Sequence, residues 1–273
     1  MIHTVVIGVG YTGKQVLHLL PEDTVTGIDR KKIDLDKETN PKLDLPAPYS
    51  ILYTVPPQPC DQRKSRIKAL LPLLKTLPQR VIYLSTSGVY GNRHGKTVSE
   101  EDLPSPQTQR AKNRLIAEKT WALWCQKQNV ELIILRVPGI YGPGRLGLQR
   151  IHAGLPVIKE EEANPANRIH VEDLAACCVF ALDENAPPGI YNVGDGAHYS
   201  STWFANTVAR LAKIKPPPTV TKMEADRTFE PARMSFINES RILNTTKMRK
   251  VLGFTPRYKD PETGIAASMK IKI

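Results

Sequence analysis

Three glycines near the start of the chain have the spacing of a diphosphate-binding turn. They follow an apolar run and lie in the segment Gly8-Val9-Gly10-Tyr11-Thr12-Gly13, which has the pattern G-x-G-x-x-G. The first glycine permits a tight turn, the second lets the backbone approach a pyrophosphate, and the third lets a helix pack closely on a strand. The first amides of that helix can donate hydrogen bonds to phosphate oxygens. We therefore predict that residues 8–13 bind a dinucleotide.

An acidic residue follows at the distance where it can contact the adenosine ribose of such a dinucleotide. Asp29 ends the strand-like run Thr24–Ile28, and its carboxylate can accept hydrogen bonds from both ribose hydroxyls and repel a 2′-phosphate. Arg30 comes next and can instead turn back to pair with a 2′-phosphate. The expected cofactor is therefore NAD or NADP, with a slight preference for NAD.

The surrounding sequence predicts the alternating strands and helices that this site needs. His3–Ile7 is a short β-branched run suited to a buried parallel strand, and Lys14–Leu20 has helical periodicity. Further strands are predicted over 50–55, 80–84, 131–136 and 190–193, and helices over 61–77, 106–118, 174–182 and 202–213. This alternation indicates an α/β fold with a doubly wound parallel sheet and ligands at the carboxyl ends of its strands. On that basis we assign Val55, Pro56 and Ser85 to the cofactor site.

Five later segments carry a family resemblance. They are Leu84–Gly91 (LSTSGVYG), Leu135–Arg145 (LRVPGIYGPGR), Arg168–Ala175 (RIHVEDLA), Gly189–Asp195 (GIYNVGD) and Lys247–Tyr258 (KMRKVLGFTPRY). Together with the glycine turn, they make the chain resemble the extended and atypical short-chain dehydrogenase/reductases, the NAD-dependent epimerase/dehydratase group. The resemblance covers nearly the whole chain. It implies a Rossmann sheet with a smaller C-terminal lobe on the substrate side.

The resemblance also implies a catalytic arrangement, from which this chain departs. The family uses a Ser or Thr, a Tyr acid/base and a Lys four residues after that Tyr. Thr86 matches the Ser/Thr position, and its hydroxyl can hydrogen-bond a substrate oxygen. Arg110 and Arg114 fall at the Tyr and Lys positions, and no tyrosine lies between Tyr90 and Tyr141. Because an arginine stays protonated, Arg110 cannot act as the acid/base, whereas Arg114 can hold a ribose or phosphate oxygen of the cofactor.

Other site residues are assigned through the same resemblance. Pro138 is expected at the nicotinamide end of the cofactor. Tyr90 and Tyr141 match positions where a tyrosine is structural or lines the substrate pocket. The expected substrate contacts are Ser87, Tyr90, Arg110, Tyr141, Arg145 and Arg168, with Asn167 and Arg233 as further candidates. His170 opens a helix-like segment, where a hydrogen-bonded structural histidine is expected.

The domain boundaries follow from where the strand and helix pattern stops. Residues 143–168 are rich in glycine and proline and predict an excursion out of the sheet, which in relatives helps to cover the substrate. We therefore assign residues 1–142 and 169–195 to the Rossmann domain. The smaller substrate-side lobe is predicted from residues 143–168 and 196–273.

Charge and composition limit the classes of partner. The net charge of +11 favours an anionic small-molecule substrate, while the scattered basic residues and the lack of a basic helix with aromatics argue against nucleic acid. No apolar run is long enough for a membrane span and no signal peptide is recognised, so a cytoplasmic location is expected. Cys60, Cys125, Cys177 and Cys178 lack metal-ligand spacing, so we expect reduced thiols and no metal. Dimers are common in the family, which makes a homodimer an expectation to test.

Two functions remain open from the sequence. The first is an atypical NAD(P)-dependent oxidoreductase, epimerase or dehydratase that acts on a nucleotide-sugar-like or other anionic small molecule, and we favour it narrowly. The second is a non-catalytic regulator, in which occupancy of the dinucleotide site changes affinity for a partner. Loss of the Tyr-Lys pair with retention of the glycine turn motivates this alternative.

Overall fold

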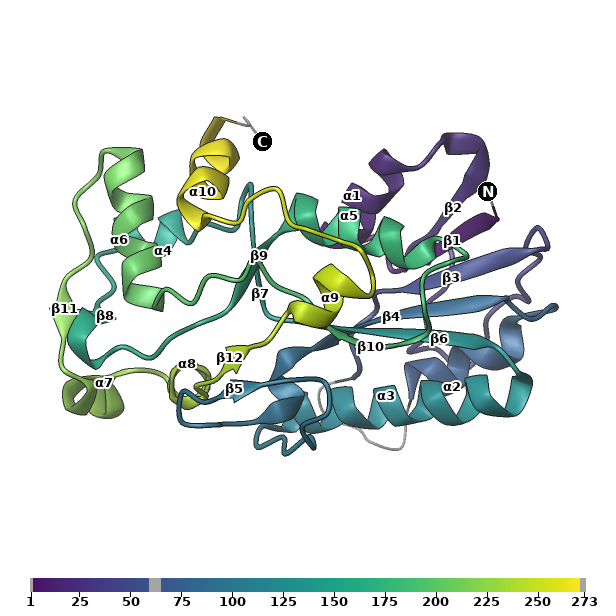
Figure 1. Ribbon diagram of the computed structural model, residues 1–273, viewed down its shortest axis with the longest axis horizontal. Coiled ribbons are helices and arrows are strands. Elements are labelled where there is room, and N and C mark those ends of the chain that lie inside the picture. The colour runs from purple at the N-terminus through teal and green to yellow at the C-terminus, as the bar shows by residue number, and fades with distance from the viewer. Residues whose placement is uncertain (1, 59–64, 271–273) are drawn as a thin grey trace.

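The computed structural model describes residues 2–58 and 65–270, and its centre is a six-stranded parallel sheet (Figure 1). The strands run in the order β10 (Gly189–Asn192), β6 (Glu131–Val137), β4 (Arg80–Thr86), β3 (Tyr49–Tyr53), β1 (His3–Ile7) and β2 (Val25–Ile28). From β1 the chain moves outward to β2 and then returns to β3 on the other side of β1. The strand order therefore reverses at β1, and the crevice for a ligand opens outside the carboxyl ends of β1 and β3. The predicted doubly wound parallel sheet is confirmed.

Helices cover both faces of this sheet. α1 (Tyr11–Leu19) and α5 (Val171–Leu182) pack together on one face, and α2 (Arg66–Leu70) and α3 (Gln109–Gln128) lie on the other (Figure 1). Because both faces are covered, the central strands are apolar on both sides, and every residue of β3 is buried. This double burial explains why continuous apolar runs in the sequence predicted the strands.

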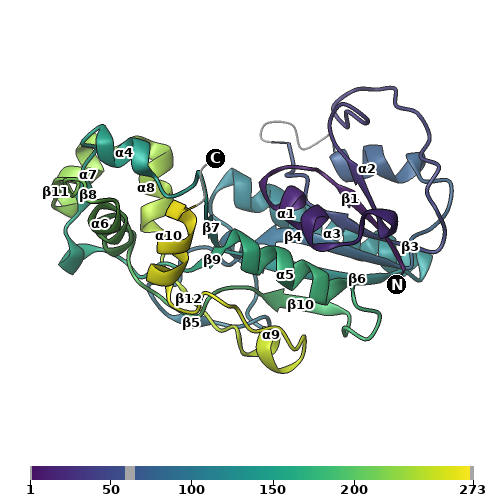
Figure 2. The ribbon, with the colours of Figure 1, turned by 90° about the horizontal axis from the view of Figure 1, so that it is seen from above.

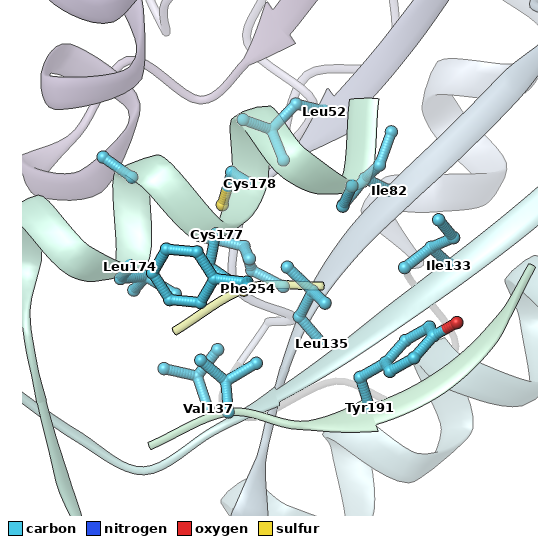
Figure 3. Close-up of a cluster of buried hydrophobic side chains, with 14 of the residues drawn as sticks. Leu52, Ile82, Ile133, Leu135, Val137, Leu174, Cys177, Cys178, Tyr191 and Phe254 are labelled. Carbon is cyan, nitrogen blue, oxygen red and sulfur yellow. The ribbon is translucent and has the colours of Figure 1, made fainter. Parts of the chain in front are cut away.

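The two faces hold separate apolar cores. Beneath α1 and α5, a cluster contains Leu52, Ile82 and Leu135 from the sheet and Cys177 and Cys178 from α5 (Figure 3). Beneath α3, a second cluster packs Tyr53 and Tyr83 around Trp121, whose ring meets that of Tyr53 edge-on at 5.3 Å. Cys125 also lies in this cluster, so the three cysteines within the described residues are buried and free of disulfides. Cys60 lies outside the described residues.

The predicted helix over 61–77 is too long. Residues 61–64 lie outside the described part; beyond them, α2 ends at Leu70 and is followed by a 3-10 turn at Leu71–Leu73. Pro72 explains the change, because proline has no backbone N–H and cannot continue the helical hydrogen bonds. The connection before β3 contains no strand, as expected. It is tied to α2 by an ion pair between Asp36 and Arg66 at 2.6 Å.

A smaller lobe lies beyond one end of the sheet (Figure 2). Its elements are α4 (Leu148–His152), β8 (Val157–Ile158), α6 (Ser201–Ala212), β11 (Thr219–Val220), α7 (Lys222–Thr228), α8 (Pro231–Asn238) and α10 (Pro261–Lys270). Two short parallel pairs join it to the sheet: β7 (Gly139–Tyr141) with β9 (Arg168–His170), and β5 (Thr97–Val98) with β12 (Ile242–Leu243). The lobe has apolar clusters of its own, around Val208 and Ile265 and around Ile158 and Met234.

One part of the predicted division does not match the packing. The sequence assigned all of residues 196–273 to the lobe. However, α9 (Thr246–Lys250) packs on β10, and Met248 and Leu252 join the core beneath α5. Phe254 lies in the same core (Figure 3). The chain thus returns to the main sheet before it ends in the lobe with α10. Such a return depends on tertiary packing and carries no local signal in the sequence.

A buried ion pair fixes α3 to the carboxyl ends of β4 and β6. Arg136 donates to Glu118 at 2.9 Å, and both side chains are almost fully buried, at 3% and 4% exposed. Ser85 also donates its hydroxyl to Glu118, and the Arg136 guanidinium lies 4.8 Å from the centre of the Tyr90 ring. The pair therefore sets the position of α3 relative to the strand ends that carry Thr86.

We expect Glu118→Ala to lower the free energy of unfolding by about 3–5 kcal/mol, because it leaves the Arg136 charge buried without a partner. Urea denaturation followed by circular dichroism measures this loss. Arg210→Ala is the control, since the Arg210–Glu262 pair is 58% and 40% exposed and its removal should cost no more than about 1 kcal/mol. Equal effects from the two substitutions would contradict the assignment of a structural role to the buried pair.

Candidate dinucleotide site and adjoining cleft

The glycine turn between β1 and α1 allows side chains at some positions and excludes them at others. Gly8 has φ of +101°, and a Cβ there would lie 2.6 Å from the Thr54 hydroxyl oxygen. A Cβ on Gly13 would lie 2.5 Å from the carbonyl oxygen of Gly8. At Gly10, in contrast, φ is −92° and no atom lies within 4 Å of an added Cβ. Gly8 and Gly13 are therefore required by the fold itself, whereas Gly10 borders open space.

The backbone of this turn presents hydrogen-bond donors to that open space. Gly10 donates its amide to the Gly8 carbonyl at 2.8 Å, and its own carbonyl accepts from Lys14 at 2.9 Å. The amides of the first helical residues, from Tyr11 to Gly13, have no acceptor within the helix. In this described turn no side chain caps the helix and no residue is acidic. The positive end of the helix is thus available to an anion.

Asp29 lies at the end of the neighbouring strand β2, beside the glycine turn. Its Oδ1 accepts hydrogen bonds from the amides of Lys31 and Lys32 at 3.0 and 3.1 Å, which fixes the half-buried carboxylate. Arg30 is exposed and forms ion pairs with Asp34 at 3.4 Å and Asp36 at 3.3 Å. Arg30, which could have paired with a 2′-phosphate, is therefore already paired with carboxylates of the protein.

A cleft of about 710 Å³ opens between the carboxyl ends of β4 and β6 and the smaller lobe. It brings together most of the predicted residues outside the glycine turn: Ser85, Thr86, Ser87, Arg110, Arg114, Pro138, Arg145, Asn167, Arg168 and Arg233. It also contains Arg150, Glu239 and Arg241, which sequence reasoning missed. These three residues belong to no recognised motif, and Arg150 is distant in the chain from Glu239 and Arg241, so nothing local in the sequence indicated them.

Thr86 stands where β4 ends. Its hydroxyl oxygen accepts a hydrogen bond from the Gly88 amide at 3.2 Å, which caps the 3-10 turn Ser87–Tyr90. The hydroxyl hydrogen remains available to an acceptor in the cleft, as a threonine hydroxyl can both accept and donate. Ser85 also lines the cleft, but its hydroxyl donates to Glu118. Of the two hydroxyls, that of Thr86 is thus better placed to contact a substrate.

The first turns of α3 supply two arginines to the same region. Arg114 donates to the Leu84 carbonyl at 2.6 Å and to the Tyr83 hydroxyl at 3.3 Å, which ties it to the end of β4. Arg110 is exposed and lines the cleft one turn earlier. Among the described residues that line the cleft, no tyrosine, lysine or histidine occurs, and Glu239 is the one acidic residue. The cleft is therefore strongly cationic.

Both predicted tyrosines are structural in this fold. Tyr90 is fully buried and donates its hydroxyl to the side chain of Asn192 at 2.8 Å. Tyr141 is 2% exposed, and burial raises the pKa of its hydroxyl. Neither side chain lines the cleft, in contrast to the substrate contact expected of both from the sequence. His170 is also buried and hydrogen-bonds Ser268 at 2.9 Å, as expected of a structural histidine.

The glycine turn and the cleft meet at one aromatic side chain. Tyr11, the first residue of α1, donates its hydroxyl to the Pro143 carbonyl at 2.9 Å. The guanidinium of Arg145, which lines the cleft, lies 4.0 Å from the centre of the Tyr11 ring. A cation above an aromatic face is attracted by the negative charge of that face. The loop after β7 is thereby held against the glycine turn.

A buried carboxylate behind the cleft was not expected from the sequence. Asp195, after β10, is 4% exposed; its Oδ1 accepts from the Ala197 amide at 2.9 Å, and its Oδ2 has no partner among the described residues. Burial raises the pKa of Asp195 to about 7, although the neighbouring Arg168 opposes the rise. Arg168 itself donates to the Tyr199 carbonyl at 2.8 Å, and burial lowers its pKa to about 10.

Comparison with known proteins shows similarity to one family over part of the chain. Residues 67–194 match the model of the NAD dependent epimerase/dehydratase family. This match agrees with the resemblance carried by the motifs of the chain. The uncharacterized protein y4nG of Sinorhizobium fredii is 23% identical over 203 residues, which make up 67% of this chain and 51% of that protein. The chain thus spans about half the length of this curated relative.

Solved structures share the fold over nearly the whole chain. A functionally unknown conserved protein from Silicibacter pomeroyi has a TM-score of 0.80 at 25% identity, and the match covers 98% of both chains. The human epimerase family protein SDR39U1 (isoform 2), solved with NADPH, has a TM-score of 0.77 at 15% identity and covers 98% of this chain and all of that one. MoeE5 in complex with UDP-glucose and NAD has a TM-score of 0.73 at 18% identity, covering 98% of this chain and 97% of that one.

Within residues 2–58 and 65–270, no helix is long and apolar enough to cross a membrane.

The raised pKa of Asp195 predicts a pH-dependent stability. Below about pH 7 the folded protein keeps a proton that the unfolded chain loses near pH 4, so stability should fall as the pH rises from 4 through 7. We expect wild type to lose roughly 1–3 kcal/mol of this contribution between pH 5 and pH 8, and Asp195→Asn to remove that loss. Urea denaturation at both pH values tests this. Asp183→Asn is the control, because the exposed Asp183 accepts a similar amide bond from Asn185. An unchanged pH slope in Asp195→Asn would contradict the prediction.

Proposed function

We propose that the protein is an NAD(P)-dependent enzyme of the epimerase/dehydratase type that acts on an anionic small molecule. The observation that carries the proposal is the open, donor-rich turn at Gly10, which adjoins a cationic cleft through Tyr11 and Arg145. A dinucleotide whose pyrophosphate binds the turn can extend toward the strand ends that border the cleft.

The residues of the turn fit a dinucleotide. The first amides of α1 would bind the pyrophosphate, and the carboxylate of Asp29 would accept hydrogen bonds from the adenosine ribose. Val55 follows β3 beside Gly8, where its backbone nitrogen lies 3.1 Å from the position of an added Cβ. The NADPH of the human SDR39U1 structure and the NAD of MoeE5 support either cofactor. The pairing of Arg30 with Asp34 and Asp36 supports the slight preference for NAD.

The cleft fits a substrate that carries negative charge. When bound, the nicotinamide supplies a hydride acceptor or donor, and the Thr86 hydroxyl would hydrogen-bond the substrate oxygen at the reacting carbon. Arg145 and Arg150 line the cleft, and their side chains form no hydrogen bond or ion pair within the described residues, so their guanidinium donors are available to phosphate or carboxylate oxygens. The cleft volume of about 710 Å³ lies within the usual range of ligand sites. The UDP-glucose of MoeE5 supports a nucleotide-sugar-like substrate.

The cofactor proposal is tested at Gly10. We expect wild type to bind NAD or NADP in the micromolar range, with a dissociation constant of about 10 μM or less. Gly10→Trp should abolish binding because the indole fills the space for the pyrophosphate, and Gly10→Ala should weaken it about tenfold or more. Gly10→Ala should keep the wild-type melting temperature to within a few degrees, since no protein atom lies within 4 Å of an added Cβ. The melting temperature of Gly10→Trp is measured alongside, so that loss of binding is distinguished from unfolding. Isothermal titration calorimetry that detects no heat with either dinucleotide would reject the proposal.

The catalytic proposal is tested at Thr86. With labelled reduced cofactor and a panel of carbonyl compounds, wild type should exchange hydride, and Thr86→Val should lower the rate by about tenfold to a hundredfold through loss of the hydrogen bond. Thr86→Ser keeps the hydroxyl and should retain most of the rate. If Thr86→Val exchanges at the wild-type rate, Thr86 has no part in the reaction. If wild type binds dinucleotide but exchanges with no carbonyl, the regulator becomes the better hypothesis.

A further inference from the structure

We propose that Arg110 and Arg241 form an anion-binding site at the end of the cleft next to Thr86, and that this site holds a carboxylate or phosphate group of the substrate. The inference rests on the proposed function for the identity of the ligand as a substrate. It goes further by placing the negative charge at the reacting end of that substrate.

Both arginines come from segments that lie close to the turn that follows Thr86. Arg241, which precedes β12, donates through Nη1 to the carbonyl of Gly91, the residue that ends this turn, at 2.7 Å. Arg110 lies in the first turn of α3, next to Ala111, whose Cβ is 3.6 Å from the position of a Cβ on Gly88. Three segments that are distant in the sequence thus meet around the turn Ser87–Gly91 that follows Thr86.

The guanidinium of Arg241 keeps unused donors although the residue is 9% exposed. Nη1 also donates to Glu239 at 3.1 Å, whereas Nε is buried without a partner and Nη2 has no hydrogen-bond partner among the described residues. In a guanidinium that is buried to this degree, each N–H group normally has a hydrogen-bond acceptor. The unused donors point to a ligand that the protein itself does not supply.

Arg110 adds an exposed charge with no counter-ion. It forms no hydrogen bond or ion pair within the described part of the chain, and it stands at the positive end of the 20-residue helix α3. Burial lowers the pKa of Arg241, and the charges of Arg110 and Arg93 lower it further, while Glu239 alone opposes them. Like charges held together at this end of the cleft would be stabilised by a bound anion.

The chemistry of the site indicates its role. Guanidinium groups bind carboxylates and phosphates through paired hydrogen bonds, and they do not release their protons in the accessible pH range. By the family motif, Arg110 stands where relatives place a tyrosine. In this chain that position would therefore orient and neutralise an anionic group instead of transferring a proton. A substrate with a carboxylate or phosphate next to the reacting carbon meets this requirement.

The test measures anion binding directly, with inorganic phosphate and malonate as probes. Each is titrated into wild type, Arg110→Ala, Arg110→Lys and Lys112→Ala, and binding is followed by calorimetry. Lys112 is a matched control because it lies on the same helix and carries the same charge, but it is exposed and does not line the cleft. We expect Arg110→Ala to weaken binding of one or both probes about tenfold or more, Arg110→Lys to weaken it less, and Lys112→Ala to change it less than about twofold.

The probes separate the two ligand types, because tighter binding of phosphate favours a phosphorylated substrate and tighter binding of malonate favours a carboxylic acid. The proposal is overturned if wild type binds neither probe at tens of millimolar, or if Arg110→Ala and Lys112→Ala have the same effect. Dinucleotide affinity, measured on the same variants, should stay within about twofold of wild type. If Arg110 controls anion binding but no variant binds dinucleotide, the anion site stands and the proposed enzyme function fails.

Discussion

The close contact between Gly13 and the carbonyl of Gly8 sets the geometry on which the rest of the molecule depends. With no side chain at either position, α1 can start directly at the end of β1, at the point where the strand order reverses. The free amides of the helix therefore face the crevice and not a neighbouring strand. Asp29 at the end of β2 and Val55 after β3 flank the turn because their strands pair with β1 on either side.

The sheet could be predicted from the sequence because its strands are buried on both faces, which requires runs of apolar residues such as His3–Ile7 and Glu131–Val137. Two kinds of feature could not be predicted. The extent of α2 was misjudged, since the apolar spacing continues past Pro72 although proline ends the helix. The return of Met248 and Phe254 to the main core depends on contacts with residues far away in the chain.

The candidate site likewise contains residues that the sequence indicates and residues that only the folded structure reveals. Residues that belong to a local motif, such as Thr86 and Arg114, could be selected from the sequence and line the cleft, whereas Arg241 was missed because its partner Gly91 comes from a distant turn. The motifs also left open whether Tyr90 and Tyr141 would be structural. Burial decides that question, because a side chain enclosed by its own core cannot reach a ligand. Motifs thus indicate which residues lie at a site, while packing decides which of them are accessible.

The contact between Tyr11 and Arg145 joins the glycine turn to the cleft. The Tyr11 ring belongs to the glycine turn and lies against the guanidinium of Arg145 in the cleft, and its hydroxyl donates to the Pro143 carbonyl in the same loop. Displacement of this ring would break its hydrogen bond to the Pro143 carbonyl and remove the aromatic face that lies against the Arg145 guanidinium. A single side chain therefore couples the position of the glycine turn to the position of a positive charge in the cleft.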